Sequence, residues 1–206
     1  MTRLFRRRGT TIAVLAVLAL TLRGGPARAA EPEQTPTQVI ETLDAALVAA
    51  MKAGPKLSPQ ARFDRLAPTI VATHDLDFIA RFALGSFWAG LTDEQREHYL
   101  AAFRDISIAT YASRFNAYAG EQFRVVSEEM LPGGDARVRS VLTTGDGDQV
   151  AFEYRLRRRD GRWRIINIVA DGVSDLALKR SEYTGVIRRE GISGLLARMD
   201  AKRHPH

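Results

Sequence analysis

The chain has 206 residues, contains no cysteine and carries a formal net charge of +6. The lack of cysteine excludes disulfide cross-links, iron–sulfur clusters and thiol catalysis, so the fold must depend on a hydrophobic core. Six arginines and no acidic residue fall within positions 1–29, so the rest of the chain is close to neutral and gives no support for a nucleic-acid partner.

The N-terminal segment has the pattern of a secretory signal peptide. An arginine run at 6–8 precedes an apolar stretch at 11–22, which is too short to span a bilayer comfortably. The tripeptide Ala-Arg-Ala at 27–29 fits the small-x-small cleavage pattern. We predict cleavage after Ala29, export to the periplasm and one mature domain at 30–206. A retained membrane anchor is the alternative.

Helical periodicity begins soon after this segment. Apolar residues recur at helical spacing from 37 to 53, and Gly54 ends the run. Ser58, followed by a proline, predicts an N-cap and a helix that continues to about Leu66. Pro68 is expected to break this helix and to start a further short piece.

Two more helices are predicted from their caps. Asp75 is a suitable N-cap for a helix rich in apolar residues. The sequence Thr92-Asp-Glu-Gln95 has the capping-box pattern and introduces the longest helix, at about 93–118. The helical half of the domain is therefore expected at 37–120.

The second half of the chain changes to the two-residue period of strands. Short runs rich in Gly and Asp separate four strand-like segments, a pattern that predicts an antiparallel meander. Helical periodicity returns at 174–203, interrupted at Gly191. We predict the α+β class, with a curled four-stranded meander packed against helices on one face. The predicted strands are 123–130, 136–144, 149–158 and 162–170, within a sheet at 122–171.

The last predicted strand has apolar residues on both of its faces. Ile165, Ile166, Ile168 and Val169 follow one another closely between two Asp-Gly turns. A strand that is apolar on both faces must be covered on both. We therefore expect it at the middle of whatever the domain encloses.

Two groups of polar residues could be interpreted as metal sites. His74, Asp75 and Asp77 form one, but a helix start with acidic residues near the positive end of its dipole explains the same pattern. Asp146 and Asp148 form the other, but they lack the remaining ligands of a calcium loop and fit a hairpin turn. No metal is expected at either place.

No catalytic motif stands out. The sequence has no Gly-x-Ser-x-Gly, phosphate-binding loop or His-Glu-x-x-His. A small α+β domain can still house acid–base catalysis of the isomerase or dehydratase kind, for which Tyr111, Glu153, Tyr154 and Asp171 are the available groups. Inward-facing tyrosines more often line an apolar interior. We therefore expect no enzyme, and keep a cone-shaped enzyme as the alternative.

Arginines crowd one predicted hairpin. Arg155, Arg157, Arg158, Arg159 and two neighbours at 162 and 164 surround its turn. A solvated hairpin tip is one interpretation. A docking patch for an acidic partner or for anionic lipid heads is the other.

Aromatic residues gather on several helices and strands. An ordinary core explains them, but the same side chains are suited to enclosing an acyl chain, since burying each methylene contributes ~0.8 kcal/mol. The residues expected to line such a cavity are Phe82, Trp88, Phe103, Tyr111, Phe115, Phe152, Tyr154, Ile166, Ile168 and Val173.

Motifs with consistent spacing run through nearly all of the mature chain. They include Phe82-Ala-Leu-Gly85 with Phe87-Trp88, Leu91-Thr-x-Glu94-Gln95-Arg96, Tyr154-x-Leu156, Gly161-x-Trp163, Gly172-Val-Ser174 with Arg180, and Gly191-Ile-x-Gly-Leu-Leu196. Together they resemble the MlaC family, also called the toluene-tolerance auxiliary proteins, which are periplasmic lipid-binding components of Mce-type ABC transport systems.

The resemblance implies a monomeric carrier that holds lipid in a hydrophobic cavity and shuttles it between the inner and outer membranes. It implies a sheet of NTF2-like appearance, no catalytic residue and no cofactor other than the lipid ligand. It further implies docking to an inner-membrane Mce/ABC transporter and to an outer-membrane lipoprotein complex. A non-lipid periplasmic interaction module, with a filled core, is a second alternative.

Two residues depart from the family pattern. Asp175 and Lys179 stand where the family commonly has apolar residues and a Tyr. The segment Asp-Gly-Val-Ser-Asp-Leu-Ala-Leu-Lys-Arg at 171–180 resembles the HpnM branch, which is associated with hopanoid biosynthesis clusters. Phospholipid and hopanoid are therefore both candidate ligands, and Asp175 and Lys179 are candidate determinants of the choice.

Overall fold

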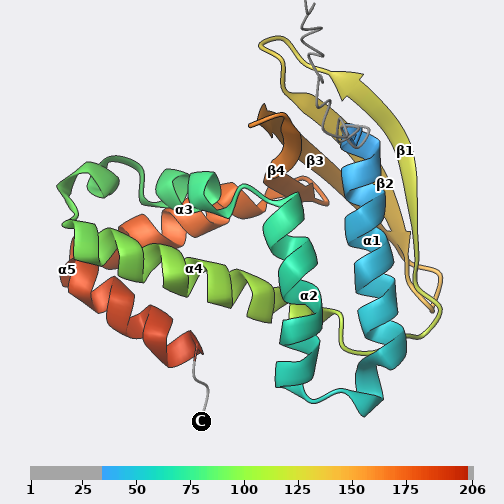
Figure 1. Cartoon of the computed structure of the whole chain (residues 1–206), viewed down its shortest axis with the longest axis horizontal. Coiled ribbons are helices and arrows are strands. Elements are labelled where there is room, and N and C mark those ends of the chain that lie inside the picture. Colours follow the sequence, from blue (N-terminus) through green and yellow to red (C-terminus); the bar gives the residue numbers. More distant parts are fainter. Residues whose placement is uncertain (1–33, 204–206) are drawn as a thin grey trace, which may run out of the picture. The chain divides into compact units, whose positions relative to one another are not determined.

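The computed structural model describes residues 34–203, and the predicted signal peptide lies outside the described residues. Four helices precede a sheet, and a long, interrupted helix follows it (Figure 1). The helices are α1 (Pro36–Ala53), α2 (Pro59–Thr73), α3 (Leu76–Leu84), α4 (Asp93–Arg114) and α5 (Asp175–Arg203), with short 3₁₀ turns at Gly54–Lys56 and Gly85–Gly90. The strands are β1 (Gln122–Met130), β2 (Ala136–Thr143), β3 (Gln149–Arg159), β4 (Arg162–Ala170) and β5 (Val173–Ser174).

The strands form one antiparallel meander in the order β1-β2-β3-β4-β5. The α+β class and the predicted meander are confirmed, with a fifth strand in addition to the predicted four. This extra strand is only two residues long, and it pairs with β4 through Val169–Ser174 and Ala170–Val173. Ser174 also accepts a hydrogen bond from the Ala177 amide, so β5 leads directly into the first turn of α5.

A β-bulge changes the faces of β4. Leu156 pairs with Ile165 and Tyr154 pairs with Ile168, which leaves one extra residue, Ile166, on β4. Because Leu156 and Tyr154 lie on the same face of β3, their partners Ile165 and Ile168 also share a face. Strict alternation would have placed those two residues on opposite faces. The bulge therefore directs more apolar side chains toward the interior than a regular strand of this sequence would.

The predicted helix caps at Ser58, Asp75 and Thr92 are confirmed. Each side chain accepts a hydrogen bond from the backbone amide three residues later, and Thr92 forms a full capping box with Gln95. Gly191 has φ 68° and ψ 179°, so α5 is interrupted where the sequence predicted a break.

The predicted break at Pro68 is wrong, because α2 continues through it to Thr73. Proline removes one backbone hydrogen-bond donor from the helix. The burial of apolar side chains along one face of α2, both before and after Pro68, keeps the helix continuous. Leu66 and Ile70, on either side of Pro68, are fully buried. Arg62, one turn earlier, donates from Nε to the Ala112 carbonyl at 2.6 Å and ties α2 to the end of α4.

Helix α4, the one predicted at about 93–118, ends earlier, at Arg114. Phe115 leaves helical geometry, with φ −105° and ψ 61°, and its ring stacks on Tyr111 with centroids 6.0 Å apart. The chain that follows passes directly over the end of α1. There, a Cβ atom on Gly54 would lie 2.0 Å from the Asn116 carbonyl oxygen.

This close passage gives a testable prediction for Gly54→Ala. The added methyl group has no room, so we expect the free energy of unfolding to fall by about 1–3 kcal/mol. Gly90→Ala is the matched control, because a Cβ on Gly90 meets nothing within 4 Å. Urea denaturation of both variants is the measurement. Equal stability of the two would show that the passage at Asn116 is not tightly packed.

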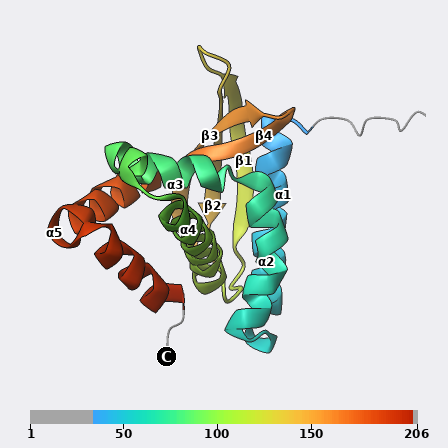
Figure 2. The same cartoon turned by 60° about the vertical axis from the view of Figure 1, so that its left-hand side comes forward.

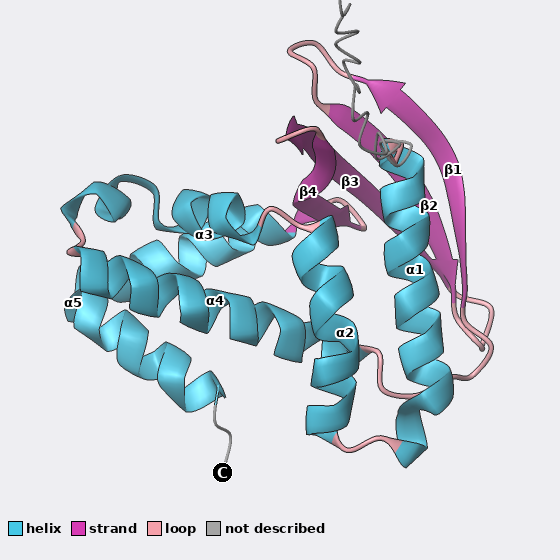
Figure 3. Cartoon of the chain, in the orientation of Figure 1, coloured by secondary structure: helices cyan, strands magenta, loops and turns pink. Residues whose placement is uncertain are grey.

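The helices form two groups that α2 joins, since α2 packs on α1 in one group and on α4 in the other. Figure 2 shows α1 and α2 side by side, with α1 packed along β1 and β2, while α3, α4 and α5 pack together beyond them. Figure 3 shows the strands gathered on one side of the helices. The core of the second group is aromatic: Tyr99 and Phe103 of α4 contact Tyr183 of α5 at centroid distances of 6.2 and 6.3 Å.

Within residues 34–203, no helix has the length and apolar character needed to cross a membrane.

Candidate functional site

A cavity of about 340 Å³ lies where the inner face of β3 and β4 meets the helices. Alternate residues of β3 point into it, as do residues one or two turns apart on α4. Its lining comprises Leu47, His74, Leu76, Ile79, Phe103, Ser107, Thr110, Tyr111, Arg114, Phe115, Phe123, Val150, Phe152, Tyr154, Ile166, Asn167, Ile168, Ala170, Asp175, Leu176 and Lys179.

The structure brings seven of the ten predicted lining residues together around this cavity. They are Phe103, Tyr111, Phe115, Phe152, Tyr154, Ile166 and Ile168. Four of their aromatic rings stack in two pairs, one pair at the end of α4 and the other on β3. Tyr111 stacks on Phe115, and Phe152 stacks on Tyr154 with centroids 5.9 Å apart. The cavity wall is therefore mainly aromatic and aliphatic.

The other three predicted residues lie elsewhere. Phe82 and Val173 are 41% and 52% exposed, on α3 and β5. Trp88 packs on Tyr99 with centroids 6.3 Å apart, and Arg81 and Arg96 lie over its ring. Their apolar character indicated burial of some kind, but nothing in the local pattern distinguishes a cavity from a helix–helix contact or from an exposed patch.

A buried polar pair interrupts the apolar wall. His74 Nε2 lies 2.9 Å from the Tyr111 hydroxyl, and His74 Nδ1 lies 3.1 Å from the Ile70 carbonyl oxygen. A carbonyl can only accept, so Nδ1 carries the proton and donates to Ile70. Nε2 is then the acceptor, and the Tyr111 hydroxyl donates to it.

Burial keeps both members of this pair neutral. It lowers the pKa of His74 to about 4, against a smaller upward effect of the Ile70 carbonyl. Burial also raises the pKa of Tyr111 well above its ordinary value. Neither group changes charge near neutral pH, so the pair is suited to hydrogen bonding rather than to proton transfer.

Removing this hydroxyl should destabilise the fold. In Tyr111→Phe, His74 Nε2 is left without its donor, and we expect a loss of about 1–3 kcal/mol in the free energy of unfolding. Tyr118→Phe removes a hydroxyl from an exposed tyrosine and serves as the control. Chemical denaturation compares the two. A Tyr111→Phe protein as stable as the control would mean that the pair contributes nothing.

Sequence reasoning did not identify His74, Ser107, Thr110, Arg114 or Asn167 as lining. Ser107 and Thr110 lie on the same side of α4 as Phe103 and Tyr111, so helical spacing could have found them. His74 could not be found in this way. It reaches the cavity because the connection between α2 and α3 forms a parallel bridge with Ile165 of β4.

The two residues that depart from the family pattern both line the cavity. Lys179 Nζ lies 2.7 Å from both carboxylate oxygens of Asp175, one helical turn earlier on α5. The pair is half-buried, with the side chains 23% and 46% exposed. It places a charged pair at a wall that is mainly apolar.

The structure does not assemble the groups considered for catalysis. Tyr111 and Tyr154 line the cavity. Glu153 instead forms ion pairs with Arg137 and Arg139 at 3.1 and 3.3 Å. Asp171 accepts from the Ala151 amide in a turn.

Two of the residues considered for metal binding, Asp75 and Asp148, take part in structural contacts. Asp75 caps α3 and forms an ion pair with Arg159 at 3.2 Å. The turn that contains Asp148 is closed by backbone hydrogen bonds to Thr144. Among residues 34–203, no group of three or more His, Asp or Glu side chains is arranged to hold a metal ion.

Comparisons with known proteins agree with this fold. The chain is 25% identical over 129 residues to the intermembrane phospholipid transport system binding protein MlaC of Haemophilus influenzae, a match covering 61% of this chain and 60% of that protein. It is 23% identical over 189 residues to toluene tolerance protein ttg2D of Pseudomonas putida, covering 90% of this chain and 84% of that protein.

A solved structure has the same fold. The phospholipid-binding protein from Ralstonia solanacearum, determined in complex with a phospholipid, superposes with a TM-score of 0.73 at 23% sequence identity. The superposition covers 82% of this chain and 97% of that one. The family model described as MlaC protein matches residues 41–201, which is most of the chain. The chain therefore belongs to the MlaC family.

Proposed function

We propose that this protein is a periplasmic lipid carrier, which holds the acyl chains of a phospholipid in the cavity between the sheet and the helices. The observation that carries the proposal is the cavity itself, with seven of the predicted apolar residues around it. Each methylene buried there contributes ~0.8 kcal/mol, so a bound chain is stabilised without any catalytic group. The relatives named for phospholipid transport and phospholipid binding support the same ligand class.

The size of the cavity is consistent with a partly enclosed ligand. Its volume of about 340 Å³ is near the lower end of the usual range for small-molecule pockets. A lipid head carrying a charged phosphate is costly to bury without partners, so it stays at or outside the cavity mouth. Loading and release then require the helices to move against the sheet.

The wider setting is part of the same proposal. The leader is cleaved after Ala29, the mature domain occupies 30–206, and the monomeric carrier exchanges lipid with an inner-membrane Mce/ABC transporter and an outer-membrane lipoprotein complex. The pair Asp175–Lys179 at the cavity wall supports selection among lipids, with a hopanoid as the alternative ligand to a phospholipid.

Native mass spectrometry of the purified protein tests the proposal. We expect a co-purifying lipid, and uptake of phospholipid by delipidated protein from vesicles. Lipid analysis of the bound species separates phospholipid from hopanoid. Absence of both co-purified lipid and uptake would reject the carrier and favour a non-lipid interaction module. Turnover of a small carbonyl substrate would instead favour the cone-shaped enzyme.

A further inference from the structure

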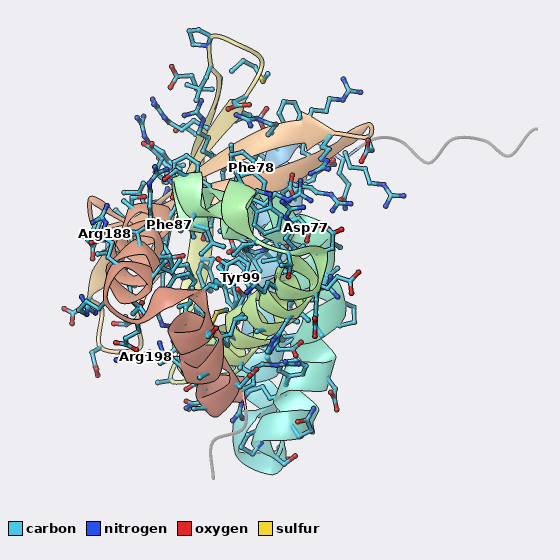
Figure 4. The ribbon with its side chains drawn as sticks, turned by 90° about the vertical axis from the view of Figure 1, so that its left-hand side faces the viewer. Asp77, Phe78, Phe87, Tyr99, Arg188 and Arg198 are labelled. Carbon is cyan, nitrogen blue, oxygen red and sulfur yellow. The ribbon has the colours of Figure 1, made fainter. Side chains whose placement is uncertain are left out.

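A second hollow, of about 650 Å³, lies beside the cavity and opens to solvent between α3, the start of α5 and the strands β3 and β4. We call it the arginine groove, after Arg155, Arg157 and Arg180, which line it together with Phe78 and Phe82. The labelled side chain of Phe78 in Figure 4 lies on α3 close to the strands.

The groove and the cavity share part of their walls. Ile166, Asn167 and Leu176 line both of them. Ile166 is the extra residue of the β4 bulge, and the Asn167 side chain accepts a hydrogen bond from Ser174 at 3.0 Å. Leu176 is on the first turn of α5. One layer of side chains, anchored where α5 begins, therefore separates the apolar cavity from the groove.

Positive charge exceeds negative charge in the groove. The carboxylate of Asp135 serves both Arg155 and Arg157, which donate to it from Nε at 2.8 and 3.0 Å. Arg180 has no carboxylate partner among residues 34–203, and its guanidinium lies 4.8 Å from the centroid of the Phe82 ring. Arg155 and Arg157 thus share the Asp135 carboxylate, with Asp75 as a further acidic neighbour of Arg157. Arg180 adds a positive charge to this group, so the groove is complementary to an anion.

Two neighbouring residues, Phe82 and Gly85, limit the movement of the Arg180 side chain. Its contact with Phe82 stacks a planar cation on an aromatic face. Gly85 also lies close to the guanidinium. Its φ of +56° favours glycine, and its lack of a side chain leaves room, because a Cβ there would be 3.0 Å from Arg180 Nη2. A guanidinium fixed in this way loses little freedom when it binds an anion, and its fork of donors fits phosphate oxygens.

We propose that the arginine groove binds the phosphate of a lipid headgroup while the acyl chains of the same lipid occupy the cavity, with Leu176 as the side chain that moves aside between the two. This inference rests on the proposed carrier function. It accounts for how a charged head avoids the apolar cavity, since the groove supplies a cation at the other side of a thin wall. Phe82, exposed and outside the cavity, becomes the platform that positions Arg180.

The test compares two ligands with the same acyl chains. Delipidated protein is offered either dioleoyl phosphatidylglycerol or dioleoylglycerol, each dispersed alone in a non-ionic detergent without phosphate, and uptake of each is measured by native mass spectrometry. We expect Arg180→Gln to lose about tenfold in affinity for phosphatidylglycerol, the size of one charge-assisted hydrogen bond, with uptake of dioleoylglycerol unchanged. Arg180→Lys, which keeps the charge, should retain part of the preference.

Arg188→Gln is the matched control. Arg188, labelled in Figure 4, is exposed on the same helix and is not among the residues that line the groove, so its substitution should leave both uptakes unchanged. A ratio of phosphatidylglycerol to dioleoylglycerol uptake that is the same in Arg180→Gln and in the natural protein would overturn the inference while leaving the carrier intact. Absence of uptake of either lipid by the natural protein would reject the carrier itself.

Competition with inorganic phosphate is a further test, because a free phosphate ion and a lipid headgroup would bind the same guanidinium groups. Competition between millimolar phosphate and phosphatidylglycerol, lost in Arg180→Gln, would support a shared site. Phosphate that binds through Arg180 without displacing the lipid would show an anion site unrelated to the headgroup and would overturn the inference.

Discussion

Ser107→Phe should abolish most lipid uptake while leaving the protein folded. Ser107 lies between Phe103 and Tyr111 on the cavity side of α4, and it is half-buried, so a phenyl ring at this position projects into the empty volume. Displacing three or four methylenes of a bound chain, each worth ~0.8 kcal/mol, weakens binding on the order of a hundredfold. Uptake from phospholipid vesicles is the measurement.

Ser113→Phe is the control for this substitution. Ser113 is on the same helix but is exposed and outside the cavity lining, so the same side-chain change should leave uptake intact. Thermal unfolding of both variants checks that the fold is preserved. Unchanged uptake by a folded Ser107→Phe protein would mean that the acyl chains do not occupy this cavity.

Asp44→Asn should stabilise the protein at alkaline pH and have little effect at acidic pH. Asp44 is buried on α1, and one of its carboxylate oxygens has no hydrogen-bond partner in the described part of the chain. Burial, and secondarily the neighbouring Glu41, raise its pKa from 3.8 to about 7. The folded protein therefore holds a proton on Asp44 between pH 4 and 7 that the unfolded chain has lost.

The direction in which stability changes with pH follows from this difference in bound protons. Stability falls as the pH rises through that window, by about 4 kcal/mol for a shift of this size, and the loss is complete above pH 7. The asparagine cannot ionise and escapes the loss. Urea denaturation at pH 5 and pH 8 is the measurement, with Glu97→Gln, which changes an exposed carboxylate, as the control. A stability difference independent of pH would contradict the raised pKa.

His74 acts in the opposite direction. Its pKa falls from 6.5 to about 4 in the folded protein, so the unfolded chain binds a proton that the folded protein does not, and stability decreases as the pH falls from 6.5 to 4. In the natural protein the two effects partly offset each other across this range. In Asp44→Asn the acid-induced loss due to His74 should appear alone, as a steeper decline in stability below pH 6.5.

The elements were predictable where local chemistry decides them. Ser58, Asp75 and Thr92 cap helices in the structure because a side-chain acceptor near a free amide is favourable in almost any context. The prediction at Pro68 was wrong because the energetic cost of a proline in a helix can be read from the local sequence. The burial of Leu66 and Ile70, which offsets this cost, depends on tertiary packing. The strand β5 was missed because two residues carry no periodicity.

The candidate site was predictable mainly in its apolar part. Phe152 and Tyr154 lie two residues apart on a strand, and Phe103 and Tyr111 lie eight apart on a helix, so period alone places each pair on one face. Among the polar lining residues, Ser107 and Thr110 follow the same helical spacing, whereas His74 depends on a contact between distant segments. His74 reaches Tyr111 across 37 residues of sequence, and no local pattern encodes that distance.

The bridge between His74 and Ile165 also limits how the layers can move. The Asp75 amide donates to the Ile165 carbonyl at 2.9 Å, which joins the α2–α3 connection to β4 by a backbone hydrogen bond. Because this hydrogen bond fixes the α2–α3 connection against β4, we expect the cavity to widen away from this point. The Asp75 amide should then exchange with deuterium only when the whole domain unfolds, whereas amides at a moving edge of the cavity should exchange faster.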